Sequence, residues 1–394
     1  MRIVSVAHAY PRWEGDIAGA FIERLAIALQ NRAHEVTMVV PSDQGQGGTA
    51  TQNGVTVRRV RYAAAASETL AYRGQMADAA SSARGKFTFA SLILAQAGGI
   101  IMESRSAQTD LTHAHWWLPG GVSAWLAHLV EHRPYVVTLH GTDVAILARS
   151  RHVRSLARLV LRRAGAVTAV SSFLAQEVAT IADIDASSIL VQPMPVSVER
   201  YGRRSVGGGG IVTVGRLVRQ KRIDVILEAV CDLRQVGLTC PLTIVGDGPE
   251  RRALEYRASQ LGLADVVEFV GTVEPDRVPE AIGDADILAF AAVGEGLGLV
   301  AAEAMMLGVP VVAARDGGGV TDIVPETGAG RLVDGTDRSA WARAIRELLA
   351  DPSSRDAAFD LGTTLKKKLA PAHVAKRYEE VYDRAVGSTG AAGA

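Results

Sequence analysis

The chain has 394 residues, of which 48% are hydrophobic, and 42 basic residues balance 42 acidic ones. This length is too great for one ordinary hydrophobic core and predicts two domains. A formal net charge of zero argues against nucleic acid as the main partner. The two cysteines, Cys231 and Cys240, fit no metal-ligand spacing and are expected to be reduced structural thiols.

The first half of the chain alternates short apolar segments with helical patterns, including helices expected at residues 20–31 and 156–163. This alternation is typical of βαβ units and predicts a parallel sheet. Residues 44–53 are expected to form a loop, and residues 73–84 a surface excursion or a mobile acceptor loop. The expected strands are residues 3–7, 36–40, 55–60, 111–115, 135–139 and 166–170.

Residues 198–210 contain four consecutive glycines and are expected to be a linker. A second set of strands follows it. The last helix carries apolar residues at helical spacing, which predicts packing rather than chemistry. The expected strands of this half are residues 211–214, 242–245, 266–270, 287–290 and 309–313. The predicted division is a first domain (1–197), the linker (198–210), a second domain (211–370), a C-terminal helix (371–386) and a flexible tail (387–394).

No signal peptide is evident, and no run approaches the about 20 apolar residues that cross a bilayer. A cytoplasmic location is therefore expected, with peripheral contact at the inner face of the membrane as an alternative. Four arginines at helical spacing could contact anionic lipid, although a solvated helix face is the favoured interpretation. They are Arg151, Arg154, Arg158 and Arg162.

The most informative segment is Glu295-Gly296-Leu297-Gly298-Leu299-Val300-Ala301-Ala302-Glu303. It follows a buried strand and opens a helix near Leu299, where unpaired N–H groups suit phosphate. The carboxylates of Glu295 and Glu303 suit sugar hydroxyls. This arrangement predicts a site for a nucleotide sugar.

Two cationic side chains, Arg216 and Lys221, come just after the expected strand 211–214. Cations fixed there would stabilise a diphosphate leaving group more in the transition state than in the ground state. His140 follows the expected strand 135–139, at the carboxyl end where parallel α/β sheets bind ligands.

These segments, in this order, resemble the retaining glycosyltransferases of family 4, which have the GT-B fold. The matching segments are Val214-Gly215-Arg216-Leu217 with Lys221, residues 242–249, residues 269–273, residues 295–303, residues 308–312 and residues 138–143. The resemblance implies an α/β GT-B protein with two Rossmann-like parallel-sheet domains facing across a cleft. It also implies retaining transfer of a hexose from a nucleoside-diphosphate sugar to a hydroxyl acceptor. A UDP-sugar is favoured and GDP-mannose is second, in glycolipid, polysaccharide or secondary-metabolite biosynthesis.

The resemblance also implies roles for individual residues. The catalytic residues would be His140, Arg216, Lys221 and Glu295. The second domain would bind the donor with Gly215, Gly246, Val270, Thr272, Val273, Gly296, Leu297, Gly298, Leu299, Val300 and Glu303. The first domain would bind the acceptor with Asp16, Gly19 and Asp143, although Asp143 could instead orient its loop. No metal or cofactor is implied, because the nucleotide sugar is a co-substrate.

The sequence departs from the family pattern at Arg222, which stands where a glycine usually follows the lysine. Arg222 could add a third positive group or point to solvent. The histidine pair His113 and His115 has no third ligand at a suitable spacing, so a metal site is not favoured. Asp284-Ala285-Asp286 precedes a strand and is expected to be structural. Two other functions remain open, a nucleotide-sugar 2-epimerase on the same fold and a noncatalytic scaffold that binds nucleotide sugars.

Overall fold

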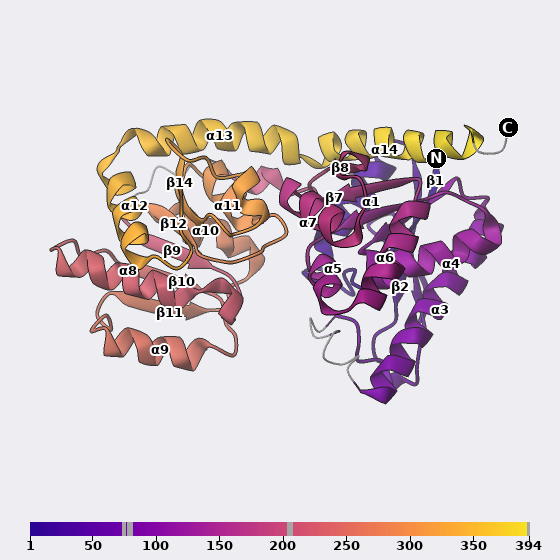
Figure 1. The fold of residues 1–394 in the computed structure, drawn as a ribbon, viewed down its shortest axis with the longest axis horizontal. Coiled ribbons are helices and arrows are strands. Elements are labelled where there is room, and N and C mark those ends of the chain that lie inside the picture. The colour runs from indigo at the N-terminus through magenta and orange to yellow at the C-terminus, as the bar shows by residue number, and fades with distance from the viewer. Residues whose placement is uncertain (73–75, 77–81, 203–207, 392–394) are drawn as a thin grey trace. The chain divides into compact units, whose positions relative to one another are not determined.

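The structure is a computed structural model that describes residues 1–72, 76, 82–202 and 208–391. The expected excursion at residues 73–84 lies largely outside the described residues, and so do residues 203–207 of the expected linker. The chain divides into two compact units, one of Met1–Val196 with Leu369–Ala394 and one of Ser197–Lys368. Each unit is an α/β domain built on a parallel sheet, as the sequence predicts (Figure 1).

The first unit has an eight-stranded sheet, in which every neighbouring pair is parallel except β3 with β4. The chain order reverses between β1 and β5, so their carboxyl ends flank a crevice where α/β sheets bind ligands. In spatial order the strands are β3 (Gly48–Gln52), β4 (Val55–Val60), β2 (Glu35–Pro41), β1 (Arg2–Val6), β5 (Leu111–His115), β6 (Tyr135–Leu139), β7 (Ala166–Ala169) and β8 (Ile189–Val191).

Strand β3 lies in the segment that the sequence interpretation assigned to a loop. It pairs antiparallel with β4, and Gln52 faces Val55 across the turn. Asn53 and Gly54 form this turn with φ values of 49° and 82°. Asn-Gly is a strong hairpin signal because both residues tolerate positive φ, so the expectation of a loop was wrong for residues 48–52.

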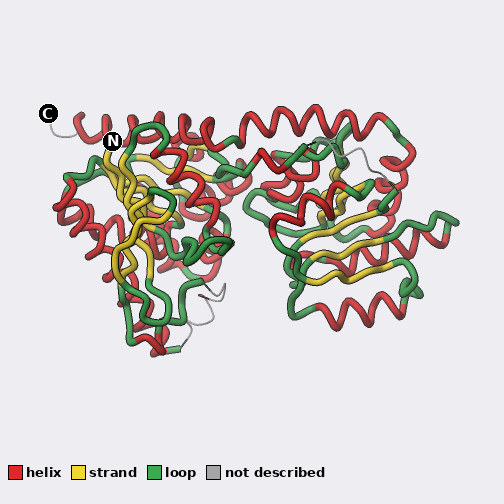
Figure 2. Tube along the Cα trace, turned by 180° about the vertical axis from the view of Figure 1, so that it is seen from behind, coloured by secondary structure: helices red, strands yellow, loops and turns green. Residues whose placement is uncertain are grey.

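The helices of the first unit cover both faces of its sheet (Figure 2). The longer ones are α1 (Ala20–Gln30), α3 (Ala83–Ala107), α4 (Val122–Glu131), α6 (Arg151–Arg163), α7 (Ser172–Ala182) and α14 (Pro371–Ala391). Helix α14 continues to Ala391, five residues beyond the predicted end of the last helix. Its predicted packing residues are buried, which confirms that part of the prediction: Val374, Tyr378, Val381, Tyr382 and Ala385.

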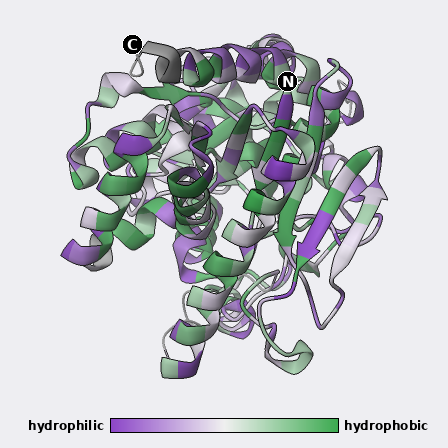
Figure 3. Ribbon diagram, turned by 90° about the vertical axis from the view of Figure 1, so that its right-hand side faces the viewer, coloured by the Kyte–Doolittle hydropathy of each residue, from purple (hydrophilic) through white to green (hydrophobic). Residues whose placement is uncertain are grey.

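Among the described residues, one helix is long and apolar enough to cross a membrane by length and composition. This helix is α3, with a mean hydropathy of 1.3 over its most apolar window, of which 33% is buried. The expectation that no segment reaches this length was therefore wrong. A single such helix is a weak indication, because α3 also packs against α4, β1 and β2 as a core helix does. Figure 3 shows the mixture of green and purple residues on the helices of this unit.

The second unit has a six-stranded parallel sheet. Its chain order reverses between β9 and β12, which marks the expected ligand-binding edge. In spatial order the strands are β11 (Val267–Gly271), β10 (Leu242–Val245), β9 (Ile211–Val214), β12 (Ile287–Phe290), β13 (Val311–Ala314) and β14 (Gly330–Val333). The helices are α8 (Ile223–Gln235), α9 (Arg251–Gln260), α10 (Val278–Gly283), α11 (Leu299–Met306), α12 (Arg338–Ala350) and α13 (Ser353–Leu369).

Asp286 connects residues 208–210 to the sheet of the second unit. The Asp286 carboxylate accepts hydrogen bonds from the backbone N–H groups of Gly208 at 2.8 Å and Gly210 at 3.0 Å. This confirms a structural role for Asp286 and shows that the last part of the expected linker belongs to the unit. Both cysteines are free thiols, as predicted.

Candidate functional site

The second unit brings Lys221 and Glu295 together at the point where its strand order reverses. Lys221 follows β9 and Glu295 follows β12, and these strands are neighbours. The Lys221 Nζ lies 2.9 Å from the Glu295 Oε1, and both side chains remain partly exposed. The same Nζ lies 5.4 Å from the ring centre of Phe290, the last residue of β12. Two of the predicted catalytic residues therefore form one ion pair at the carboxyl edge of the sheet.

The backbone of Glu295 is held by a glycine-rich turn. Its N–H donates to Gly317 O at 3.0 Å, and its carbonyl accepts from the Gly319 N–H at 2.8 Å. A Cβ on Gly318 would lie 2.4 Å from the Glu295 carbonyl oxygen, so only glycine fits this contact. This turn fixes the direction in which the Glu295 carboxylate leaves the loop.

Helix α11 begins directly after this loop. Its N-cap is Gly298, with a φ of 77°, and no side chain caps the N-terminal N–H groups. Leu299 and Val300 form its first turn and are partly exposed, whereas the Leu297 side chain is buried. Leu297 can thus contribute only its backbone to a donor site. Glu303 lies about one turn into the helix and is partly buried.

The carboxyl ends of β9, β10 and β11 lie close together, and glycines make the backbone contacts between them. Gly215 N–H donates to Val245 O at 2.9 Å, and Gly246 N–H donates to Gly271 O at 2.8 Å. Three of the predicted donor-binding residues lie at the end of the edge strand β11 or just after it. Val270 and Thr272 are exposed and Val273 is half-buried, so these side chains can be covered by a ligand.

Gly246→Ala is expected to lower the free energy of unfolding by about 3 kcal/mol, since a Cβ there would lie 2.0 Å from the Gly215 carbonyl oxygen. Chemical denaturation measures this loss. Gly237→Ala is the control, because Gly237 also has a positive φ, 84°, but a Cβ there meets nothing within 4 Å. Equal losses in the two variants would contradict the steric explanation.

The remaining basic residues of this loop differ in their surroundings. Arg216 is exposed, and no ion pair joins it to another described residue. Arg222 donates to both carboxylate oxygens of Asp316, at 2.9 and 2.5 Å, and to Ala291 O at 2.8 Å. Neither alternative for Arg222 is therefore correct. Its guanidinium is committed to the fold, and it does not point freely to solvent.

In the first unit, His140 and Asp143 lie on the loop after β6, but they have different roles. The Asp143 carboxylate is buried and accepts hydrogen bonds from the N–H groups of Trp117, His140 and Gly141 at 3.0–3.1 Å. Burial raises the pKa of Asp143, and these N–H groups oppose the rise. These hydrogen bonds support the alternative that Asp143 orients the His140 loop, and its assignment to acceptor binding stays a prediction.

His140 is the end of a row of three histidines. Its Nε2 lies 3.2 Å from the His115 Nδ1, and the His115 ring lies 4.3 Å from the ring of His113. The His113 Nδ1 meets the Tyr382 hydroxyl of α14 at 2.9 Å, and its Nε2 meets the Thr138 hydroxyl at 2.7 Å. Burial lowers the pKa of His113 to about 3 and lowers the pKa values of His115 and His140 well below 6.5. All three imidazoles are therefore neutral near pH 7.

The amino-terminal loop does not present its predicted acceptor residues. The Asp16 carboxylate pairs with Arg12 at 2.7 Å and accepts from the Ala18 N–H at 3.1 Å. Although burial opposes it, this hydrogen bonding lowers the pKa of Asp16. A Cβ on Gly19 would lie 2.4 Å from Ala9 O, so the close approach at Gly19 is to its own backbone. Both residues shape the loop in the free protein, and their assignment to acceptor binding stays a prediction.

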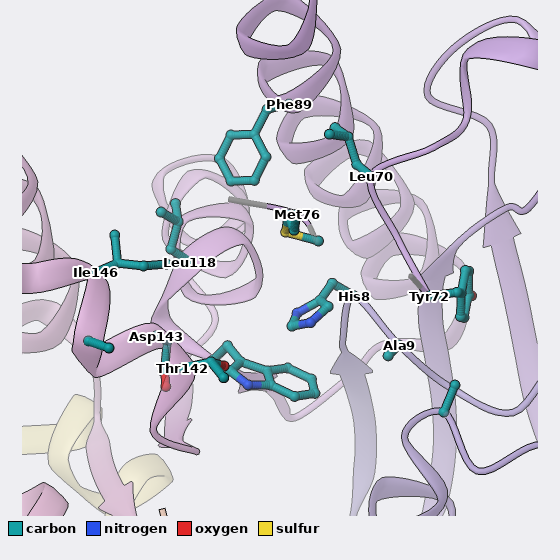
Figure 4. Close-up of a pocket in the computed structure, with 13 residues that line it drawn as sticks. His8, Ala9, Leu70, Tyr72, Met76, Phe89, Leu118, Thr142, Asp143 and Ile146 are labelled. Atoms are coloured by element: carbon teal, nitrogen blue, oxygen red, sulfur yellow. The ribbon is translucent and has the colours of Figure 1, made fainter. Parts of the chain in front are cut away.

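A cavity of about 620 Å³ lies beside this loop in the first unit (Figure 4). His8, which follows β1 as His140 follows β6, lines it, as does Trp116 after β5. The Trp116 ring centre is 3.9 Å from that of His8 and 4.6 Å from that of His140. Sequence reasoning missed His8, although its place at a strand end was the available signal. Among the described residues, no group of three or more His, Cys, Asp or Glu side chains could hold a metal ion.

Comparisons with known proteins match both units. The family model for the glycosyl transferase 4-like domain matches residues 18–195, and the model for glycosyl transferases group 1 matches residues 207–360. A 2-deoxystreptamine glucosyltransferase of Streptomyces kanamyceticus is 30% identical over 272 residues, which cover 62% of this chain and 69% of the relative. A D-inositol 3-phosphate glycosyltransferase of Corynebacterium urealyticum is 30% identical over 304 residues, which cover 69% and 71%.

Among solved structures, HepE of Anabaena in complex with UDP and glucose is similar, with a TM-score of 0.70 and 19% identity. The match covers 97% of this chain and 99% of that one. At this identity the likeness concerns the fold alone.

Proposed function

Because the chain belongs to the family 4 glycosyltransferases and has the GT-B fold, we propose that it moves a hexose from a UDP-sugar to a hydroxyl acceptor. The transfer retains the anomeric configuration and needs no metal or other cofactor. The observation that carries this proposal is the Lys221–Glu295 pair at the strand-order reversal of the second unit, beside the uncapped start of α11.

The second unit is the proposed donor domain. In the free protein Lys221 and Glu295 neutralise each other. A bound diphosphate would compete for the Lys221 ammonium, and the released Glu295 carboxylate would accept hydrogen bonds from sugar hydroxyls. Arg216 is exposed and can turn its guanidinium to the same diphosphate. Cationic support of the leaving group also suits the front-face attack that the family resemblance implies for a retaining reaction.

The nature of the donor and of the acceptor is part of the proposal. UDP-glucose is favoured, because a structural neighbour holds UDP and glucose and a relative is named as a glucosyltransferase. GDP-mannose is second. The first unit is the proposed acceptor domain, and the acceptor would belong to glycolipid, polysaccharide or secondary-metabolite biosynthesis. The epimerase and scaffold alternatives are not favoured, since the matched family models and the named relatives are transferases.

A cytoplasmic location is proposed because nucleotide sugars are the donors, and peripheral contact at the inner face of the membrane is the open alternative. The arginines of α6 would carry this contact. Arg158 already donates to Ala182 O at 2.7 Å and pairs with Asp183, which favours the solvated interpretation of this helix face. Flotation with anionic vesicles tests the alternative.

A thermal-shift panel tests the donor site. A ligand at 100 times its Kd that binds only the folded chain adds about 2.7 kcal/mol to the free energy of unfolding. We expect UDP and UDP-glucose to raise the Tm more than GDP does, and Glu303→Ala to weaken this rise by removing a ribose partner. Glu255→Ala, on the exposed side of α9, is the control and should keep the full shift. An absence of stabilisation by every nucleotide and nucleotide sugar would contradict the proposed donor site.

The anomeric configuration of the product, measured by NMR, tests retention.

A further inference from the structure

The cavity of the first unit has a mainly apolar wall. Its volume of about 620 Å³ lies within the range of small-molecule pockets, which bury most of a bound ligand. In Figure 4, Phe89 of α3, Leu118, Ile146 and His8 surround the same space. The apolar lining residues are Ala9, Ala18, Leu70, Tyr72, Met76, Phe89, Trp116, Leu118, Ala145 and Ile146.

The carboxylate and the phenol hydroxyl in this wall already have hydrogen-bond partners. The Asp143 carboxylate accepts three backbone N–H groups, and the Tyr72 hydroxyl donates to Pro41 O at 2.7 Å and meets Arg59 at 3.1 Å. None of the described lining residues is a lysine or an arginine. A phosphate or carboxylate placed in the cavity would therefore lose its hydration without gaining a cation, which is strongly unfavourable.

His8 supplies the one buried polar atom of the wall that lacks a partner. Its Nδ1 is buried and makes no hydrogen bond with the described part of the chain. Burial lowers the pKa of His8 to about 4, so the ring is neutral near pH 7. A neutral imidazole can exchange one hydrogen bond with an uncharged hydroxyl, ether or carbonyl group.

The cavity also adjoins the proposed acceptor site. Trp116 lines the cavity, and its ring contacts the ring of His140. Three residues of α5 (Thr142–Ala145), which directly follows His140 and Gly141, form another part of the wall: Thr142, Asp143 and Ala145. The Trp116 ring therefore contacts both the cavity and His140.

We propose that the cavity binds an uncharged alkyl or aryl aglycone, so that the acceptor is a molecule with an apolar group beside the hydroxyl that receives the sugar. This inference rests on the proposed function, in which the first unit holds the acceptor. An anionic polyol or organic acid would find no counter-charge in this cavity.

Isothermal titration of two glucosides tests the proposal. Octyl α-D-glucoside, kept below its micellar concentration, and methyl α-D-glucoside differ only in seven methylenes. Burial of about four of these methylenes would make the octyl compound bind roughly a hundredfold more tightly. Phenyl α-D-glucoside in a third titration distinguishes an aryl from an alkyl preference. Equal affinities for the octyl, phenyl and methyl compounds would overturn the proposal.

Variants place the binding in the cavity. Phe89→Ala should weaken octyl glucoside binding about tenfold, whereas Phe87→Ala, on the same helix but 78% exposed, should not change it. Ala145→Trp is a second variant, which fills the cavity from an exposed position and should fold even if Phe89→Ala does not. Unchanged octyl glucoside binding in folded Ala145→Trp would overturn the proposal, as would tight competition by D-myo-inositol 3-phosphate.

The nucleotide thermal shift separates this inference from the proposed function. Stabilisation by UDP-glucose without preference for the octyl or phenyl glucoside would overturn the inference and leave the donor site intact. Cavity-dependent binding of octyl glucoside without stabilisation by any nucleotide sugar would support the apolar site and overturn the proposed function.

Discussion

Replacing Lys221 with alanine is expected to lower turnover roughly a hundred- to a thousandfold, the usual effect of removing one preorganised charge that stabilises a transition state. The Lys221 Nζ sits at the carboxyl end of β9, 2.9 Å from the Glu295 carboxylate and above the Phe290 ring. In the proposed reaction the diphosphate gains negative charge as the sugar bond breaks, so this cation acts more strongly in the transition state than on the bound donor.

Steady-state kinetics with the best donor and acceptor measure this loss. Arg219→Ala is a matched control, because Arg219 lies in the same short 3-10 helix but its side chain is 92% exposed. The control should keep nearly the parental turnover. It removes one positive charge, as Lys221→Ala does, so the two variants have the same net charge. Parental turnover in folded Lys221→Ala would contradict the assignment of Lys221 to the catalytic site.

Glu295→Ala is expected to lower turnover by a similar factor, because the sugar would lose a hydroxyl partner and Lys221 its anchor. The double variant should then be little worse than either single variant, since residues that act as a unit are not additive. Neither change should unfold the chain, because the two side chains are 20% and 23% exposed and partly exposed pairs contribute about 1 kcal/mol or less to stability. Fully additive losses would show that the two residues act separately.

The free energy of unfolding is expected to fall between pH 7 and pH 5 because of buried histidines, by about 2 kcal/mol through His113 and by a further amount through His115. Both are buried and neutral, and burial lowers the pKa of His113 from 6.5 to about 3 and that of His115 well below 6.5. The unfolded chain binds protons as the pH falls through 6.5, whereas the folded chain does not. Stability from these groups is therefore complete above pH 6.5 and decreases toward lower pH, by about 2 kcal/mol for His113 at pH 5. His8 and His140, whose pKa values burial also lowers, add to this decrease.

Denaturant unfolding at several pH values between 5 and 7 measures this slope. His113→Gln should reduce the loss by about 2 kcal/mol, whatever its effect at pH 7. Tyr382→Phe removes the hydroxyl that meets the His113 Nδ1 but keeps the histidine, so it should lower stability at every pH and leave the slope unchanged. His152→Gln, at an exposed position of α6, is a second control. Asp143 changes the stability with pH in the opposite direction, because burial raises its pKa, but all of these variants retain Asp143. A slope unaffected by His113→Gln would contradict the prediction.

His140 and Asp143 belong to the same sequence motif but have different roles in the structure. The resemblance placed both His140 and Asp143 in the site. In the structure only the His140 ring borders Trp116, whereas the Asp143 carboxylate is consumed by backbone N–H groups. A motif identifies which loop matters, but it does not show every partner of a side chain, since Trp117, one of the three N–H donors to Asp143, lies in the turn after β5.

The sequence by itself determined the two-sheet architecture and most of the strands, because the apolar runs of buried parallel strands are local patterns. It also determined the loop of Glu295 and the loop of Lys221 as candidate sites. Only the tertiary structure decided that these two side chains form one ion pair, since the adjacency of β9 and β12 depends on strand order. The structure also decided that Asp16 and Arg222 are committed to internal ion pairs, and that His115 and His113 connect His140 to α14. It alone revealed the apolar cavity, because segments from β1, α3, β5 and β6 meet there and no single segment carries its pattern.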